Sequence, residues 1–318
     1  MPRLLDVKNL TVGIKDKKRT LKAVDNISFS IDEGEIVGLA GESGCGKSTT
    51  ALSITNLLPL GFQILSGEIK LNNVLLSNMD ELELCNVREK EIGIIFQDSK
   101  QALNPLMRVG HQIAEMLEKD TGKKQSLKIL ENLGFEEPLK IFNAFPHQLS
   151  GGMCQRIMAA IAAIRFPSLL IADEPSSSLD EESQLNVLSH LMKMNKDYET
   201  SILIISHDLS LLRQYCSRIL VMYAGKIVED CKAEKLYSPL HPYTDALINT
   251  IPSKEKRGKK LKTISGKVPA IEDNFSGCPF APRCQKTKKI CLEEFPGAKK
   301  TEDNHLVYCY YPIEGYNE

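Results

Sequence analysis

The sequence of 318 residues predicts an α/β fold with buried strands at its centre. Three short, continuous apolar runs, EIVGLAG (35–41), SLLIADE (168–174) and SILIISHD (201–208), read as strands that are covered on both faces. A polar loop and a segment with helical spacing follow each run, which is the alternation expected of an α/β core. Hydrophobic residues make up 42% of the chain, enough for a substantial buried interior.

The regions around these strands differ in pattern. The first ~75 residues alternate apolar with polar side chains, as in KAVDNISFSI (22–31), and predict a β-rich part. Residues from about 100 to 165 have more helical spacing, so we expect a helical subdomain there. The composition shifts after ILVMYAGKIVED (219–230). We therefore expect one domain over residues 1–235 and a small C-terminal extension over residues 236–318.

Charge and composition narrow the functional class. The net charge is -1, so no global positive field favours nucleic-acid binding. Apolar stretches such as IMAAIAAI (157–164) fall short of the about 18–20 residues that span a bilayer. The N-terminal MPRLLDVKNL leads straight into strand-like alternation and predicts no signal peptide. We therefore expect the nine cysteines to stay reduced, without a disulfide framework.

The segment GESGCGKST (41–49) matches G-x-x-x-x-G-K-[ST] between a predicted strand and a predicted helix. Its glycines let the backbone N–H groups converge on one anion, and the helix N-terminus adds its dipole. Lys47 would place a positive charge on the terminal phosphates of ATP, and Ser48 would offer a hydroxyl to Mg²⁺. Cys45 is either a thiol made redox-sensitive by the helix terminus or a residue at a permissive position. The candidate ATP-binding residues of this segment are Gly41, Glu42, Ser43, Gly44, Cys45, Gly46, Lys47, Ser48 and Thr49.

Two carboxylates end the apolar run SLLIADEP (168–175). Asp173 is placed to hold Mg²⁺, directly or through water. Glu174 can accept a proton from an attacking water molecule, which is the role of a general base. Beside a phosphate-binding loop, this pair indicates an enzyme that hydrolyses ATP.

Four further segments resemble ABC transporter ATP-binding subunits. LSGGM (149–153) resembles their signature sequence, SSSLD (176–180) their D-loop, SHD (206–208) their switch histidine and IIFQD (94–98) their Q-loop. With the phosphate-binding loop, these segments follow one another in the order of that family over residues 4–235. The resemblance implies a RecA-like parallel sheet, an antiparallel β-subdomain and a helical subdomain.

The resemblance also implies a mechanism. Such subunits pair head to tail, so that the signature of one chain completes the ATP site of the other. The residues that would act across the pair are Ser150, Gly151, Gly152 and Asp180. His207 would contact the γ-phosphate, and Gln97 would join the Mg²⁺ shell and report to the transport partner. Ile14 stands where the family usually has an aromatic residue stacked on adenine.

The tail resembles the C-terminal extension of oligopeptide and dipeptide importer ATPases. HPYTDALINTIP (241–252) and the order G-C-x-F-x-x-R-C from residue 277 are the residues that carry this resemblance. Four cysteines at spacing C-x5-C-x6-C-x17-C lack the C-x-x-C knuckle of structural zinc sites. The resemblance implies a [4Fe–4S] cluster; zinc and no metal remain the alternatives, and we read His305 as structural. The expected iron ligands are Cys278, Cys284, Cys291 and Cys309.

These resemblances together predict an ATP-hydrolysing subunit of an importer for di- and oligopeptides. The expected partners are a homologous ATP-binding subunit in a heterodimer, two transmembrane permease subunits and an extracytoplasmic solute-binding protein, with no nucleic acid. The expected location is the cytoplasmic face of the inner membrane, as a peripheral subunit. Two alternatives stay open at this point: an importer of the same type for nickel, a metallophore or another solute, and a soluble ABC ATPase without a transport role.

Overall fold

The structure is a computed structural model that describes residues 2–15, 20–117, 122–175, 181–251, 263–271 and 275–313. The chain forms two compact units. Unit 1 is built mainly from Met79–Ile205, and unit 2 from Leu5–Ile31, Ile36–Asn78 and Ser206–Glu318. Among the residues that the structure describes, no helix combines the length and apolar character needed to cross a membrane.

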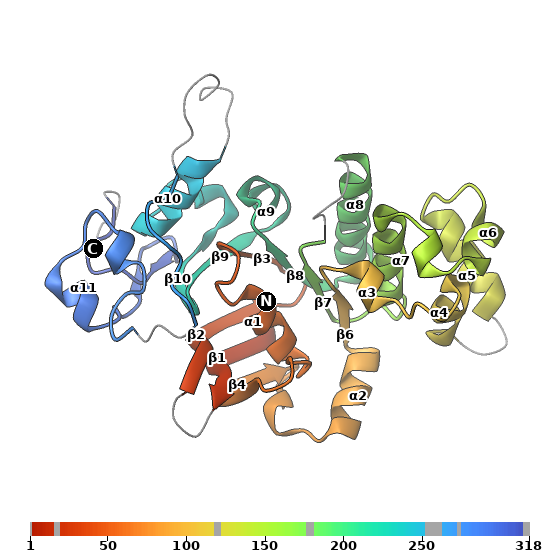
Figure 1. The fold of residues 1–318 in the computed structure, drawn as a ribbon, viewed down its shortest axis with the longest axis horizontal. Coiled ribbons are helices and arrows are strands. Elements are labelled where there is room, and N and C mark those ends of the chain that lie inside the picture. Colours follow the sequence, from red (N-terminus) through yellow and green to blue (C-terminus); the bar gives the residue numbers. More distant parts are fainter. Residues whose placement is uncertain are drawn as a thin grey trace. The chain divides into compact units, whose positions relative to one another are not determined.

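In the residues that the structure describes, unit 1 contains three parallel strands and the helices α2 to α8 (Figure 1). The strands pair in the order β8-β7-β6, with Leu169 opposite both Ile92 and Ser201. The strands are β6 (Ile92–Ile95), β7 (Leu169–Asp173) and β8 (Ser201–Ser206). The helices are α2 (Glu81–Lys90), α3 (Ser99–Ala102), α4 (Val109–Glu115), α5 (Gly122–Asn132), α6 (Pro138–Asn143), η2 (Pro146–Gln148), α7 (Gly151–Ala163) and α8 (Glu181–Tyr198).

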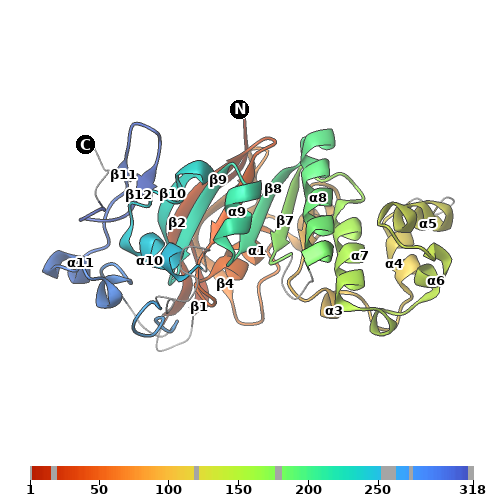
Figure 2. The ribbon, with the colours of Figure 1, turned by 90° about the horizontal axis from the view of Figure 1, so that it is seen from above.

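The core of unit 1 explains why its strands read as continuous apolar runs. Every residue of β7 and β8 is buried, so both faces of these strands are covered. Helices α7 and α8 pack against each other, and α4, α5 and α6 form a cluster of their own (Figure 2). The predicted strands at 168–174 and 201–208 are confirmed, and the stretch from about 100 to 165 consists of helices α3 to α7 and their connections.

Unit 2 contains two sheets. The first is antiparallel between β1 and β4, with the order β2-β1-β4-β5, and carries the alternating N-terminal pattern. In the second, β3 runs parallel to β9, and the antiparallel strands β10, β12 and β11 continue beyond β9. The strands are β1 (Arg3–Lys15), β2 (Thr20–Asp32), β3 (Ile36–Ala40), β4 (Gln63–Leu71), β5 (Val74–Leu75), β9 (Arg218–Tyr223), β10 (Lys226–Lys232), β11 (Lys299–Lys300) and β12 (Leu306–Val307).

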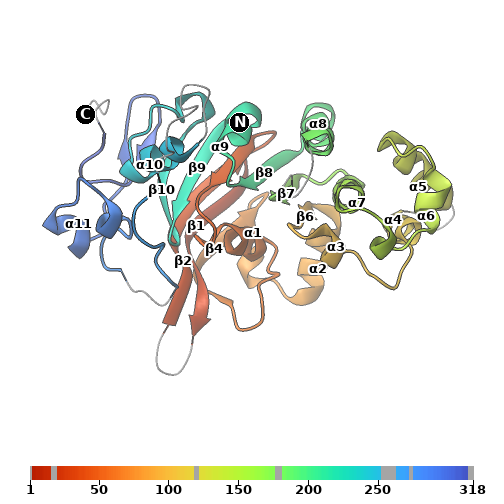
Figure 3. The same cartoon turned by 45° about the horizontal axis from the view of Figure 1, so that its top comes forward.

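Unit 2 also contains short helices, some of them in the tail. Helix α9 packs against β3, and the short helix α11 contacts η5 in the tail. Figure 3 shows α11 in the blue part of the ribbon. The tail joins the sheet directly, because β12 pairs with β10 through Glu229 and Asp230. The helices are α1 (Lys47–Ile54), η1 (Leu76–Asn78), α9 (Leu209–Tyr215), η3 (Ala233–Lys235), α10 (Pro242–Thr250), η5 (Ala281–Arg283) and α11 (Lys289–Glu293). The predicted α/β fold, with an antiparallel sheet in the N-terminal part, is therefore confirmed.

Candidate functional site

The phosphate-binding loop, residues 41–48, connects β3 of unit 2 to the first turn of α1. Gly46 precedes α1 with a φ of 105°, a left-handed conformation that glycine adopts without steric cost. A Cβ atom at this position would lie 2.6 Å from the carbonyl oxygen of Ala23, so no side chain fits. The glycine of the predicted motif is therefore required by the backbone angle and by the space around it.

Lys47 is the first residue of α1, and its side chain folds back onto the loop. Its ammonium group donates hydrogen bonds to the carbonyl oxygens of Gly41 at 2.8 Å and Glu42 at 3.0 Å. Lys47 is 6% exposed, whereas Ser48 and Thr49 behind it are half-buried. The positive charge is thus held beside the curled backbone, where an anion bound by the N–H groups of the loop would meet it.

Cys45 lies inside the loop and is 1% exposed. Burial raises the pKa of its thiol, and the nearby charge of Lys47 opposes this only in part. A thiol with a raised pKa stays protonated at neutral pH and reacts slowly. The structure therefore favours the permissive position over the redox-sensitive thiol. The backbone carbonyl of Cys45 accepts a hydrogen bond from the N–H of Gly225 at 2.9 Å, which anchors the loop to the turn after β9.

The two predicted carboxylates lie at the end of β7 in unit 1. Asp173 is the last residue of the strand and is 8% exposed. Glu174 follows with a φ of 47°, a strained angle for a side-chain-bearing residue and of a kind that gathers at functional sites. Its N–H donates to the carbonyl oxygen of Ile205 at 2.9 Å, and its carboxylate accepts a hydrogen bond from Nε2 of Gln97 at 3.2 Å. The structure thus brings Gln97, a predicted member of the Mg²⁺ shell, into contact with Glu174, the predicted base.

Two other predicted residues of the ATP site lie at strand ends. Ile14 is half-buried near the end of β1. His207 is exposed directly after β8, and the next residue, Asp208, caps helix α9. The carboxylate of Asp208 accepts hydrogen bonds from the N–H groups of Ser210 at 2.8 Å and Leu211 at 3.2 Å. This cap fixes the direction of the chain immediately after the histidine.

The signature segment begins helix α7, as expected from its sequence. The hydroxyl of Ser150 caps the helix by accepting a hydrogen bond from a backbone N–H of the first turn at 3.3 Å. Gly151 is exposed with open space around it, and Gly152 is half-buried. Helix starts of this kind offer N–H groups and a positive dipole end to an anion. Cys154, in the first turn of α7, is fully buried and packs inside unit 1. Asp180 lies outside the described residues.

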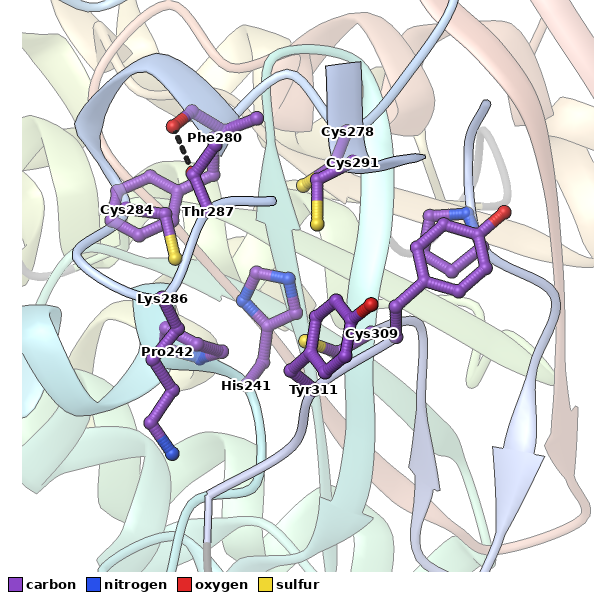
Figure 4. A pocket seen from close by; sticks show the side chains of 13 residues that line it. His241, Pro242, Cys278, Phe280, Cys284, Lys286, Thr287, Cys291, Cys309 and Tyr311 are labelled. Carbon is purple, nitrogen blue, oxygen red and sulfur yellow. Dashed lines mark hydrogen bonds between the residues drawn. The ribbon is translucent and has the colours of Figure 1, made fainter. Parts of the chain in front are cut away.

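The four cysteines of the tail line one pocket of unit 2, the cysteine pocket (Figure 4). About 340 Å³ of this pocket, its mouth included, is free of protein atoms. Each of the four is a free thiol, and burial raises the pKa of Cys278 to about 12 and that of Cys309 to about 11. Within the described part of the chain, no group of three or more His, Cys, Asp or Glu side chains is arranged to hold a metal ion. The four are Cys278, Cys284, Cys291 and Cys309.

His241 also lines the cysteine pocket, and its ring lies among the thiols (Figure 4). Its Nδ1 accepts a hydrogen bond from the N–H of Tyr243 at 3.0 Å, so the ring proton is on Nε2. Burial lowers the pKa of His241 to about 4, which keeps the ring neutral at physiological pH. Nε2 is buried and has no hydrogen-bond partner among the described residues. A buried N–H donor without an acceptor is costly, and here it borders a pocket lined with sulfur.

Glu229 on β10 anchors the tail to the sheet. This carboxylate is 0% exposed and accepts hydrogen bonds from the N–H groups of Leu240 at 2.7 Å and His241 at 3.1 Å. Nε2 of His305 lies 2.7 Å from the same carboxylate. This contact agrees with the structural role predicted for His305, because the residue joins the segment of β12 to β10 and does not line the cysteine pocket.

Replacing Glu229 by alanine is expected to lower the free energy of unfolding by about 3–5 kcal/mol, because it leaves several buried polar groups unsatisfied. Chemical denaturation of the purified chain measures this change. Glu234→Ala removes an exposed carboxylate nearby and is expected to change the same quantity by less than about 0.5 kcal/mol. Equal stabilities of the two variants would contradict the anchoring role of Glu229.

Comparison with protein families identifies two regions of the chain. Residues 24–177 match the model described as ABC transporter. Residues 228–291 match the model described as oligopeptide/dipeptide transporter, C-terminal region. The second match contains His241 and three of the cysteines that line the pocket.

Similar proteins cover nearly the whole chain. The oligopeptide transport ATP-binding protein AppD of Bacillus subtilis is 40% identical over 99% of this chain and 99% of its own. The dipeptide transport ATP-binding protein DppD of Escherichia coli is 36% identical over 98% of this chain and 97% of its own. Among solved structures, a dimeric ATP-binding cassette in a post-hydrolysis state bound to ADP and Pi superposes with a TM-score of 0.66. It is 28% identical, and the match covers 72% of this chain and 99% of that cassette.

Proposed function

Because this chain belongs to the family of ATP-binding subunits of oligopeptide and dipeptide ABC transporters, we propose that it hydrolyses ATP to energise the import of di- and oligopeptides. The observation that carries the proposal is the presence, in one chain, of the ATP-handling motifs and of the peptide-transporter tail. The tail indicates that the transported solute is a peptide, whereas the ATP motifs alone do not indicate the transported solute.

The residues of the ATP site take roles that follow from their chemistry. The N–H groups of the phosphate-binding loop and the ammonium of Lys47 bind the phosphates. By their motifs, Ser48, Asp173 and Gln97 would each offer a side-chain oxygen to the Mg²⁺ ion that accompanies ATP. Glu174 removes a proton from the attacking water, and His207 contacts the γ-phosphate. Phosphoryl transfer depends mainly on positioning and charge neutralisation, which these groups supply. Ile14 provides apolar contact to adenine in place of an aromatic ring.

The signature at the start of α7 acts on the ATP bound by a second subunit. The exposed position of Ser150 and Gly151 supports this role, since the helix start is open to a partner's nucleotide. By their motifs, Gly152 and Asp180 act across the same pair of subunits. ATP then joins the two subunits, and its hydrolysis releases them. The partner is a homologous, distinct ATP-binding subunit, so the pair is a heterodimer.

The paired subunits attach peripherally to two transmembrane permease subunits at the cytoplasmic face of the membrane, and an extracytoplasmic binding protein delivers the peptide. Affinity purification of this chain from detergent-treated membranes should recover both permeases and the second ATP-binding subunit. Recovery of the chain alone, with ATP hydrolysis stimulated by nucleic acid, would instead identify a soluble ABC ATPase. If the binding protein retains nickel chelates or metallophores and no peptide, the transported solute is not a peptide.

We propose that the cysteine pocket holds a [4Fe–4S] cluster, with Cys278, Cys284, Cys291 and Cys309 as its ligands. Four thiolates in one pocket would repel one another unless a metal centre compensates their charge, and their spacing lacks the C-x-x-C knuckle of structural zinc sites. A cluster has one thiolate on each iron and so spreads its ligands around a larger group. The unpartnered Nε2–H of His241 supports this fit, because sulfur atoms of a cluster can accept its hydrogen bond. A bound cluster supplies charge compensation for four thiolates and a redox couple.

Anaerobically purified protein is expected to be brown and to contain about four irons per chain, as a Cys₄ cluster requires. Cys284→Ser should lose this iron, whereas Cys85→Ser, which changes an exposed cysteine of unit 1, should retain it. Metal analysis of the three proteins makes the comparison. Stoichiometric zinc in a colourless protein, or full iron content in Cys284→Ser, would contradict the cluster.

A further inference from the structure

Arg283 belongs to the tail, next to Cys284, yet its side chain reaches the phosphate-binding loop. Its Nη1 donates to Oε2 of Glu42 at 2.9 Å, and its Nη2 donates to Oε1 of the same carboxylate at 3.4 Å. The two side chains are 5% and 22% exposed, so the ion pair is largely shielded from water. A two-point contact of this kind suits the planar guanidinium of arginine and cannot be copied by lysine.

Each of the five N–H groups of Arg283 has an acceptor. Besides their bonds to Glu42, Nη1 donates to the hydroxyl of Tyr223 at 3.0 Å, and Nη2 donates to the carbonyl oxygen of Ile264 at 3.1 Å. The fifth, on Nε, donates to the carbonyl oxygen of Ser265 at 2.9 Å. A guanidinium that is almost buried and fully paired has one orientation and forms a rigid support.

Glu42 is held at three points. Besides the carboxylate bound by Arg283, its N–H donates to the hydroxyl of Tyr243 at 2.9 Å, and its carbonyl oxygen accepts from Lys47 at 3.0 Å. Tyr243 is 0% exposed, and its ring packs on that of Tyr223 with 4.5 Å between ring centroids. The tail therefore supports the same loop residue that meets the ammonium group of the phosphate-binding lysine.

The charge of Glu42 makes this support relevant to ATP. Glu42 places a carboxylate in a loop whose proposed ligand carries several negative charges. Arg283 compensates that carboxylate, and no other cation reaches it within 4 Å among the described residues. Without Arg283, the carboxylate would repel the triphosphate and would be free to rotate away from its present position.

We propose that Arg283 is a positioning residue for the phosphate-binding loop. It acts through Glu42, holding the loop in the conformation that receives phosphate and cancelling the carboxylate charge, and it does not touch the nucleotide. The proposal rests on the proposed function in one respect, that the ligand of the loop is ATP. It gives the C-terminal extension a part in ATP binding that is separate from any metal centre.

The test compares ATP affinity and turnover in Arg283→Gln with the unchanged full chain. Arg283→Gln is expected to raise the Kd for ATP, and the KM, about tenfold or more, with kcat changed much less, because a charge-assisted contact supports binding. Arg283→Lys keeps the positive charge but cannot make the two-point contact, so it should bind ATP more tightly than Arg283→Gln and less tightly than the unchanged chain. Lys289→Gln removes an exposed cation of the same tail and should leave Kd and KM unchanged.

The double variant Arg283→Gln with Glu42→Gln separates positioning from general damage to the tail. Because the repelling carboxylate is removed together with its partner, the double variant should bind ATP more tightly than Arg283→Gln alone. Iron content and thermal stability are measured on each variant to follow the tail itself.

The outcomes are distinct. A Kd in Arg283→Gln equal to that of the unchanged chain would overturn the positioning role. The same conclusion would follow from additive effects in the double variant, or from a loss of kcat with KM unaltered. An unchanged chain that fails to bind ATP would overturn the proposed function itself.

Discussion

Replacing Glu174 by glutamine is expected to lower ATP turnover by about 10²–10⁴-fold, the usual contribution of a general base, while ATP still binds. Glutamine keeps the size of the side chain and its contact with Gln97, but it cannot take a proton from water. Because we propose that hydrolysis releases the paired subunits, we expect the variant to accumulate as an ATP-bound pair. Single-turnover hydrolysis and size-exclusion chromatography with ATP measure the two effects.

The matched control for this substitution is Glu131→Gln. Glu131 is an exposed carboxylate on α5 of unit 1, so its loss should leave turnover within about twofold of the unchanged chain. Hydrolysis at the normal rate in Glu174→Gln would show that another group is the base. A variant that no longer binds ATP would show that Glu174 serves nucleotide binding.

Replacing Lys47 by alanine is expected to weaken ATP binding by about 100-fold or more, because each charge-assisted hydrogen bond contributes roughly 1.5–3 kcal/mol. The ammonium of Lys47 is buried beside the loop, and we propose that it binds the phosphates. Its loss also removes the two hydrogen bonds that fold the side chain onto the loop. Equilibrium binding of a fluorescent ATP analogue measures the change in Kd.

Lys70→Ala provides the control for charge removal within the same unit. Lys70 lies on β4, partly exposed, and pairs with Glu68 at 3.0 Å, a surface contact of small energetic value. Its substitution should leave the Kd for ATP unchanged. If Lys47→Ala binds ATP as tightly as Lys70→Ala, the loop at 41–48 is not the phosphate site.

The core and the ATP motifs could be predicted because their residues are neighbours in the sequence. Strands such as β7 and β8 are buried at every position, so they read as continuous apolar runs. The loop at Gly46 and the cap at Ser150 depend on local backbone geometry, which short motifs record.

The contacts between the tail and the loop could not be predicted in this way. Arg283 and Glu42 are 241 positions apart, and Tyr243 and Glu42 are 201 apart, so no local pattern links them. The arginine and the tyrosine are visible in the tail motifs, but the residue that they hold becomes clear only from the fold. The Cys45 thiol shows a related limit: its place at a helix start suggests a lowered pKa, whereas the burial of the loop raises it.

The most direct test of the proposed function is ATP hydrolysis by the whole transporter in lipid vesicles. This chain, its partner subunit and the two permeases are reconstituted together, with the binding protein and a peptide added on the opposite side from ATP. We expect peptide-loaded binding protein to stimulate hydrolysis and peptide to accumulate on the ATP side, and we expect Glu174→Gln to abolish both. Hydrolysis at the same rate with and without peptide, with no peptide movement, would contradict the proposed function.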